Sequence, residues 1–145
     1  MSRIFIVEDH FVMQEVYDDL ISREPDLEIC GQAKTVEEAL AAIPECQPDL
    51  VIVDVSLSGK NGIELVTALK EQSPDIPTLM ISGHDESIYA EEAVRVGARG
   101  YIMKDKFRMF TVAIRQVLNG KIYLSKEIRD RFSGTEWLDQ IESDP

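Results

Sequence analysis

The chain has 145 residues and a formal net charge of −12, with 44% hydrophobic and 29% charged residues. This length suits one domain with a buried core and is too short for two ordinary domains, and the composition is globular. No apolar run approaches the roughly 20 residues that cross a bilayer, and the N-terminus does not read as a signal peptide, so we expect a cytoplasmic protein without a membrane segment, whose acidic balance opposes direct binding to nucleic acid.

Five short apolar runs alternate with segments that carry apolar residues at helical spacing. In chain order the runs predict strands over Arg3–Val7, Leu27–Gly31, Leu50–Asp54, Pro77–Ser82 and Gly100–Lys104. The helical stripes fall between and after them, over residues 13–21, 36–43, 65–69, 90–94 and 110–118. The stripe over 90–94 is short and built of small residues, so we expect this helix to be the least firmly anchored.

Residues at the helix ends support these boundaries. Two pairs fit a capping box, in which each residue satisfies a free backbone N–H of the other: Thr35 with Glu38, and Asn61 with Glu64. Gly97 and Gly120 stand where helix C-caps would.

Strict alternation of strands and helices predicts right-handed crossovers and a doubly wound α/β fold, with a five-stranded parallel sheet covered on both faces. Both faces of such strands are buried, which explains why the runs are mostly apolar and do not alternate with polar residues. In open sheets of this kind ligands bind beyond the carboxyl ends of the strands. We expect the folded domain over residues 1–121, followed over 122–145 by a C-terminal extension or linker that is partly helical and has an acidic end.

A carboxylate stands directly after the third of these runs. Asp54 follows four apolar residues, where a lone charge is costly unless something pairs with it. By itself this residue is most simply the start of a solvated turn. Other polar residues end the neighbouring strands, and in a parallel sheet all of them reach one edge: Glu8 and Asp9, Ser82, and Lys104.

This combination of groups suits phosphoryl transfer to a carboxylate. Three adjacent carboxylates repel one another, and a hard divalent cation such as Mg²⁺ would hold them together through oxygen ligands. The metal and the Lys104 ammonium would neutralise charge on the incoming group, and Ser82 would add a hydroxyl donor. Asp54 leaves the central strand and is the predicted nucleophile.

The same residues resemble the motifs of the receiver domain of two-component response regulators, over roughly residues 2–120. The matching segments are "IVEDH", "VDVSLSGKNG", "MISGH" and "GARGYIMKD". The resemblance implies a flavodoxin-like three-layer sandwich, and it is strongest to the branch with LuxR-type helix-turn-helix outputs. The implied function is that of a phosphoprotein in a phosphorelay, a signalling switch controlled by phosphorylation.

The resemblance also implies the acceptor and the metal ligands. Asp54 would be the phosphoacceptor. Mg²⁺, or alternatively Mn²⁺, would be held by Asp9 and Asp54, by the backbone carbonyl of Ser56, and by Glu8 through a water molecule.

Four further residues receive roles in the same way. Lys104 and Ser82 would assist phosphoryl transfer, and Gly62 would be the glycine of the turn after the acceptor. Ser82 and Tyr101 would form the switch, with Tyr101 turning inward when Ser82 moves; Tyr101 is equally well explained as a half-exposed aromatic residue of a strand. The chain departs from the family at Ser58, where a proline is usual.

The implied partners are a histidine kinase or a histidine phosphotransfer protein. A homodimer or a downstream protein would bind through the last two helices and the last strand, where Ile88, Tyr89 and Tyr101 would add apolar area. No direct contact with nucleic acid or membrane is expected of this chain.

Two other interpretations stay open at this point. The chain is also explained as the N-terminal receiver of a DNA-binding transcriptional regulator whose output domain is absent from it, or, less in keeping with the complete acidic set, as a docking module with an idle site. A phosphatase of the haloacid dehalogenase type is disfavoured, because it needs a second acid where Ser56 stands. We therefore expect no enzyme activity beyond self-phosphorylation and self-dephosphorylation at Asp54.

Overall fold

A single parallel sheet forms the centre of the molecule. The computed structural model describes residues 1–57, 60–83, 89–124 and 126–131. Within these ranges six strands pair in parallel in the order β2-β1-β3-β6-β7-β8. Their bounds are β1 (Ser2–Val7), β2 (Leu27–Ala33), β3 (Leu50–Asp54), β6 (Thr78–Ser82), β7 (Gly100–Met103) and β8 (Tyr123–Leu124). A separate antiparallel pair consists of β4 (Ser56–Leu57) and β5 (Lys60–Asn61).

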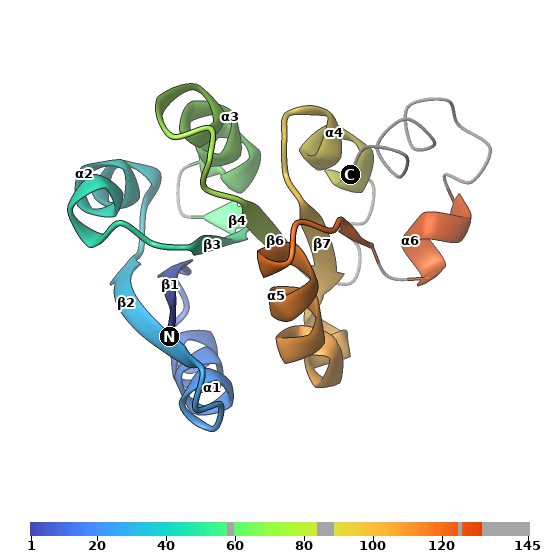
Figure 1. The fold of residues 1–145 in the computed structure, drawn as a ribbon. Coiled ribbons are helices and arrows are strands. Elements are labelled where there is room, and N and C mark those ends of the chain that lie inside the picture. Colours follow the sequence, from blue (N-terminus) through green and yellow to red (C-terminus); the bar gives the residue numbers. More distant parts are fainter. Residues whose placement is uncertain (58–59, 84–88, 125, 132–145) are drawn as a thin grey trace.

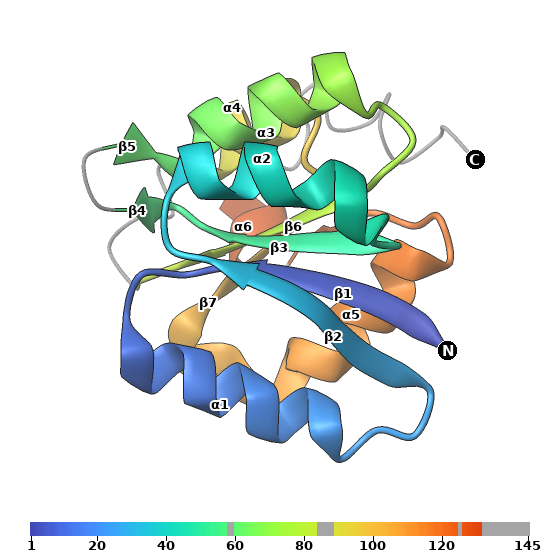
Figure 2. The same ribbon diagram turned by 90° about the vertical axis from the view of Figure 1, so that its left-hand side faces the viewer.

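Helices cover both faces of the sheet (Figures 1 and 2). One face carries α1 (Phe11–Ser22) and α5 (Phe110–Leu118), and the other carries α2 (Val36–Cys46), α3 (Gly62–Gln72) and α4 (Ala90–Arg95). A 3₁₀ helix, η2 (Lys104–Met109), leads from β7 into α5, and α6 (Lys126–Arg131) follows β8. The predicted doubly wound three-layer sandwich is confirmed. The five predicted helices and the five predicted strands are all present.

Alternate residues of each central strand supply two separate cores. In β1, Ile4 and Ile6 pack beneath α1 and α5, whereas Phe5 and Val7 pack beneath the helices of the opposite face. All residues of β3 and β6 are buried. Because both sides of these strands face apolar layers, their sequences show continuous hydrophobic runs without a polar alternation.

The predicted helix ends are confirmed where the structure describes them. The Thr35 hydroxyl accepts the backbone N–H of Glu38 over 3.1 Å, although the Glu38 carboxylate reaches the backbone N–H of Lys34 and not that of Thr35. Gly97 and Gly120 have φ angles of +117° and +83°, which favour glycine after a helix. The side chain of Asn61, the second predicted cap, lies outside the described residues.

The prediction of five strands is wrong by one, because β8 was not recognised. It pairs in parallel with β7, and both of its residues are buried. Ile128 of α6 is also buried and packs with the core under α2, α3 and α4. The segment that we expected to form an extension after residue 121 thus adds a strand and a buried side chain to the fold.

The first strand pairing contains an irregularity. Ile4 of β1 pairs with Ile29, but the next residue, Phe5, pairs with Gly31, so Cys30 is an extra residue in β2. Such a bulge bends the strand and increases its twist.

Both cysteines are free thiols, and Sγ of Cys46 lies 3.6 Å from the carbonyl oxygen of Cys30. No helix in the described ranges is both long and apolar enough to cross a membrane.

Candidate functional site

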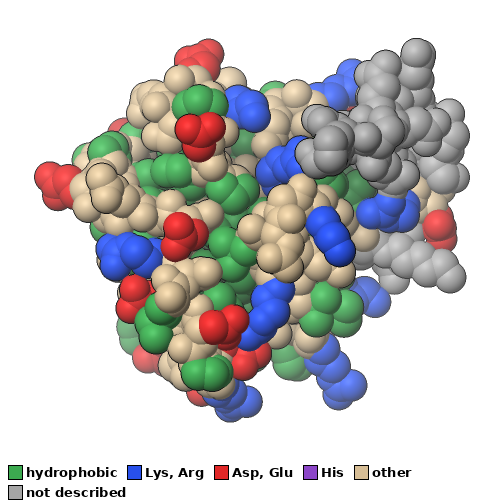
Figure 3. Space-filling model, viewed as in Figure 1, with side chains coloured by type: hydrophobic (Ala, Val, Ile, Leu, Met, Phe, Trp, Pro, Cys, Tyr) green, Lys and Arg blue, Asp and Glu red, His purple; other side chains and the backbone are tan. Residues whose placement is uncertain are grey.

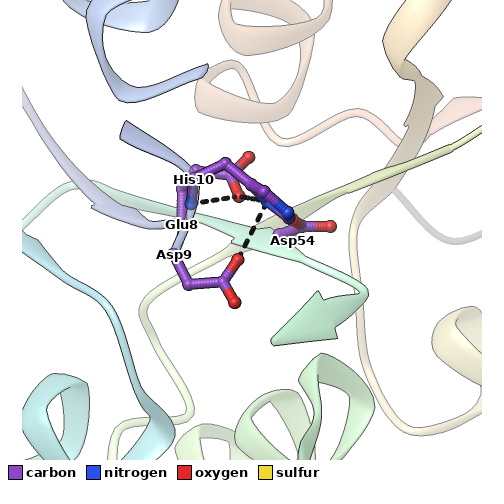
Figure 4. Close-up of side chains that lie close together, drawn as sticks. All are labelled: Glu8, Asp9, His10 and Asp54. Atoms are coloured by element: carbon purple, nitrogen blue, oxygen red, sulfur yellow. Dashed lines mark hydrogen bonds and ion pairs between the residues drawn. The ribbon is translucent and has the colours of Figure 1, made fainter. Parts of the chain in front are cut away.

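Three carboxylates meet at the carboxyl edge of the sheet. Glu8 and Asp9 directly follow β1, and Asp54 is the last residue of β3, which pairs with β1. Together with His10 they offer one potential ligand atom each, and these four atoms lie within 4.8 Å of one another. Figure 4 shows the three acids gathered around the His10 ring. Glu8 is 0% and Asp54 2% exposed, so their charges are removed from water.

Lys104 completes the cluster from the other side of β6. It follows β7, two strands away from β3, and its long side chain crosses the end of β6. Its Nζ donates a hydrogen bond to Oδ2 of Asp54 over 3.1 Å and lies 3.6 Å from Oε1 of Glu8. One ammonium group therefore bridges the two most deeply buried carboxylates.

The charges of this cluster shift one another's protonation. Burial and the neighbouring Glu8 raise the pKa of Asp54 to about 7, although Lys104 opposes the shift. Burial lowers the pKa of Lys104, but the carboxylates of Asp54 and Glu8 outweigh it and raise that pKa overall. A hydrogen bond with Glu8 and the charge of Asp9 raise the pKa of His10.

Helix α1 holds Glu8 in place. The Tyr17 hydroxyl donates to Oε1 of Glu8 over 3.4 Å, and the buried amide of Gln14 donates to the Glu8 carbonyl oxygen over 2.6 Å. The Tyr17 ring stacks on Phe110 of α5, with the ring centroids 5.1 Å apart. Sequence reasoning assigned Tyr17 only to the apolar stripe of this helix and did not recognise either contact.

The turn after β3 fixes the second oxygen of Asp54. The backbone N–H of Ser56 donates to Oδ1 of Asp54 over 3.1 Å. The backbone N–H of Gly62 donates to the carbonyl oxygen of Val55 over 2.7 Å. A Cβ at Gly62 would overlap the main-chain carbonyl of Asp54, so glycine is needed here for close approach.

Ser82 and Tyr101 do not contact Asp54 through any hydrogen bond that the described structure contains. Ser82 ends β6 at the same edge, but its hydroxyl donates to the carbonyl oxygen of Gly83 over 3.0 Å. Tyr101 is 0% exposed and packs in the core under α2, α3 and α4. The expectation that Tyr101 adds exposed apolar area is therefore wrong. Its ring is buried in the core even though the Ser82 hydroxyl is bonded to the carbonyl oxygen of Gly83.

The donor atoms of the cluster fit a hard divalent cation. Carboxylate oxygens from Glu8, Asp9 and Asp54 lie within 4.8 Å of one another, and two of the three acids are buried. Mg²⁺ prefers oxygen ligands of this kind. His10, which the sequence did not single out, lies among them, because an exposed histidine after two acids gives no sign of inward orientation.

Comparison with known proteins agrees with the geometry. Residues 4–115 match the family model described as the response regulator receiver domain. The chain belongs to this receiver family. The predicted resemblance is thereby confirmed.

Several characterised relatives of this receiver are transcription factors. It is 36% identical over 105 residues to the DNA-binding transcriptional activator DevR/DosR of Mycobacterium tuberculosis, a match that covers 72% of this chain and 48% of that protein. It is 31% identical to the transcriptional regulatory protein DesR of Bacillus subtilis, over 99% of this chain and 72% of the relative. The chain thus spans about half to three quarters of these relatives.

The receiver fold also matches solved structures. A two-component response regulator of the LuxR family from Aurantimonas sp. SI85-9A1 superposes with a TM-score of 0.85 at 30% identity, over 90% of this chain and 94% of that one. This supports the expected likeness to the LuxR-type branch. Ile88, which sequence reasoning placed on the output face, lies outside the described residues, as does Ser58.

Proposed function

We propose that this receiver domain is a phosphorylation-dependent signalling switch that accepts a phosphoryl group on Asp54. The observation that carries the proposal is the buried carboxylate of Asp54 at the end of β3, with Lys104 3.1 Å from one oxygen and two further acids beside it. A solvated turn would need none of these partners. The donor would be a histidine kinase or a histidine phosphotransfer protein.

The transfer requires little covalent chemistry from the protein. The bond between phosphorus and the donor's imidazole nitrogen breaks, a bond from phosphorus to an Asp54 oxygen forms, and the released imidazole takes up a proton. Asp54 must be ionised to attack, and the Lys104 ammonium and the Ser56 N–H both favour its charged form. These donors also hold the carboxylate in a fixed orientation, which aligns it with the incoming group.

Glu8, Asp9, Asp54 and the backbone carbonyl of Ser56 would hold Mg²⁺. When bound, the ion would neutralise charge on the transferred phosphoryl oxygens. It would also offset the repulsion among the three carboxylates, which the Lys104 ammonium offsets in the structure. Any activity as an enzyme is limited in this proposal to self-phosphorylation and self-dephosphorylation at Asp54.

Ser82 and Tyr101 would transmit the change. In the structure the Ser82 hydroxyl is bonded to Gly83, and phosphorylation would draw it towards the new phosphoryl oxygens. Because Tyr101 is already buried, the conformational response would consist of a rearrangement around its ring and not of its inward rotation.

Exposed apolar side chains suggest where a phosphodonor would dock. Phe11 and Val12 begin α1 directly after the acids and are 66% and 70% exposed, and Phe107 in η2, soon after Lys104, is 54% exposed. Figure 1 shows both segments on the same side of the sheet. A donor surface that covers them would bring its histidine to Asp54.

Charge is distributed unevenly, which bears on partners. Ten of the fifteen Lys and Arg residues, but only three of the 27 Asp and Glu residues, lie between Arg95 and Arg131. Figure 3 shows basic side chains mostly over the half of the molecule with β7, α5 and α6.

The expected output face also differs from the sequence interpretation, because β8 covers the edge of β7. A second copy or a downstream protein would therefore meet α4 or α5 together with β8.

A second candidate is supported by the relatives, which are DNA-binding or transcriptional regulators longer than the matched part. In this case the domain would control a DNA-binding output domain within a longer regulator, and would not itself contact DNA. Both candidates place the domain in the cytoplasm, where its two free thiols suit a reducing environment.

Labelling with acetyl phosphate and Mg²⁺ tests the proposal, with phosphorylation measured by intact-protein mass spectrometry. Wild-type protein should gain one phosphoryl group, and Asp54→Asn should gain none, because an amide is a poor nucleophile. Asp75→Asn is the matched control, since Asp75 is an exposed residue after α3, and it should be labelled like the wild type. Equal labelling of Asp54→Asn and wild type would refute the assignment.

A further inference from the structure

His10 is directed into the acidic cluster by its position in the chain. It follows Glu8 and Asp9 and precedes α1, with an extended backbone (φ −92°, ψ 118°). Its Nδ1 lies 3.1 Å from Oε2 of Glu8, 3.0 Å from Oδ1 of Asp9 and 3.9 Å from Oδ2 of Asp54. One nitrogen atom therefore approaches oxygens from three different carboxylates (Figure 4).

These separations match the spacing of ligands around one ion. A six-coordinate ion with bonds of about 2.1 Å places adjacent ligand atoms about 3.0 Å apart and opposite ones about 4.2 Å apart. The four potential ligand atoms of the cluster all lie within 4.8 Å of one another. The imidazole nitrogen thus occupies the same kind of position as the carboxylate oxygens.

A nitrogen ligand discriminates between metals. Mg²⁺ takes oxygen ligands and gives up its waters reluctantly, so an imidazole adds little to its binding. Imidazole suits transition metals, and the affinity of a given site rises from Mn²⁺ through Fe²⁺ to Co²⁺. A site with three carboxylates and one imidazole consequently differs in preference from a site with oxygens alone.

We propose that Nδ1 of His10 is a direct ligand of the receiver-site metal and shifts the preference of the site from Mg²⁺ towards transition-metal ions such as Co²⁺ and Zn²⁺. This inference rests on the proposed function, because the ion concerned is the one that would accompany transfer to Asp54. His10 is then the residue that determines metal specificity, and Asp9 and Asp54 supply the oxygens common to both kinds of ion. The His10 side chain is 61% exposed, so the ring stands at the rim of the cluster and not in the buried core.

The competing explanation is that the His10 ring is only a tethered counter-ion, displaced by any divalent metal. A counter-ion opposes all divalent ions alike, so its removal raises the affinities for Mg²⁺ and Co²⁺ by the same factor. Removal of a ligand instead lowers the affinity for Co²⁺ and leaves that for Mg²⁺ almost unchanged. The ratio of the two affinities separates the explanations.

The ratio is measured by calorimetric titration of the full chain with Mg²⁺ and with Co²⁺ at mildly alkaline pH. Loss of even an outer-shell partner of a metal costs about 10–100-fold in affinity, so the Co²⁺-to-Mg²⁺ ratio should fall at least about tenfold in His10→Ala. Glu15→Gln is the matched control, because Glu15 is exposed on α1, which begins directly after His10, and its change alters charge without removing a cluster atom. This control should keep the wild-type ratio.

Nitrogen NMR of histidine-labelled protein titrated with Zn²⁺ gives a direct readout. The chain has two histidines, and the spectrum of His10→Ala identifies which signals belong to His10. The Nδ1 resonance of His10 should shift on addition of Zn²⁺. Asp9→Asn should abolish this shift, because it removes a ligand of the same ion.

The failures of the two proposals are distinguishable. An unchanged ratio in His10→Ala, with Mg²⁺ still bound at a site that Asp9→Asn weakens, overturns the role of His10 and leaves the proposed function intact. A wild-type protein that binds no divalent ion in the titration overturns both.

Discussion

Nζ of Lys104 and Oδ2 of Asp54 lie 3.1 Å apart, although the two residues are 50 positions apart in the chain and leave strands separated by β6. The same ammonium is 3.6 Å from the fully buried carboxylate of Glu8. Removing one partner from such a buried group leaves an uncompensated charge, which costs more than the pair itself contributes.

Lys104→Met should therefore destabilise the metal-free domain by about 1–3 kcal/mol, as measured by urea unfolding, because it leaves the buried carboxylates without their hydrogen-bond donor. Added Mg²⁺ should recover part of the loss, because it supplies positive charge to the same carboxylates. Labelling by acetyl phosphate should also fall. Lys121→Met, at an exposed position, is the control, and an equal loss of stability there would show that the effect does not come from the acidic cluster.

The raised pKa of Asp54, about 7, predicts how stability depends on pH without Mg²⁺. Its value in the unfolded chain is close to 3.8, so the folded state binds the proton more tightly and stability is lost as pH rises between the two values. Asp54→Asn cannot ionise and escapes this loss. Its advantage in unfolding free energy should grow by roughly 4 kcal/mol between about pH 4 and about pH 8.

Denaturant unfolding of both proteins at each pH checks this expectation. A constant difference across the range would mean that Asp54 is not protonated more readily in the fold. Saturating Mg²⁺ should reverse the trend, because the ion binds the ionised carboxylate and stabilises the wild type alone.

Gly62→Ala should displace the acceptor. Its Cβ would overlap the carbonyl of Asp54, so the backbone must move to relieve the overlap. A cost of about 1–3 kcal/mol is typical of such overpacking. Gly120→Ala is the matched control: its φ is +83° but nothing lies within 4 Å of the added carbon. Both variants should lose stability, while only Gly62→Ala should lose acetyl phosphate labelling. Normal labelling of Gly62→Ala would show that this turn does not position Asp54.

Ile128→Ala should show that α6 belongs to the folded unit. The side chain is 1% exposed within the core under α2, α3 and α4, and truncation of such a residue costs about 2–5 kcal/mol. Val112→Ala is the control, since Val112 is 39% exposed on α5 and should lose little. Thermal unfolding of both variants gives the comparison, and equal midpoints would mean that residues after β8 do not contribute to the core.

The strands that could be predicted are those that are buried on both faces. The segments over residues 4–7, 50–53 and 79–81 have no polar interruption, so their continuous hydrophobicity identified these strands. The two residues of β8, Tyr123 and Leu124, are too few to show any period. They form a strand because they pair with the edge of β7, and no local pattern in the sequence indicates this pairing.

The candidate site could likewise be predicted from the sequence only in part. The convergence of Glu8, Asp54 and Lys104 followed from parallel topology, because each stands at a strand end. The inward direction of His10 and the contact of Tyr17 with Glu8 depend on side-chain orientation. Neither a histidine after two acids nor a tyrosine in a helical stripe indicates that orientation, so both were missed. The burial of Tyr101 was missed for the same reason.

The two edges of the sheet have a consequence for aggregation. An exposed strand edge is a template on which a second chain can add its own strand, and long flat edges are the most hazardous. Here β2 is distorted by the extra residue Cys30, and β8 offers only two residues for pairing. Growth of the sheet from one copy into the next is disfavoured at both ends, so two copies would associate through side chains of α4 or α5 and β8 and not through a continued sheet.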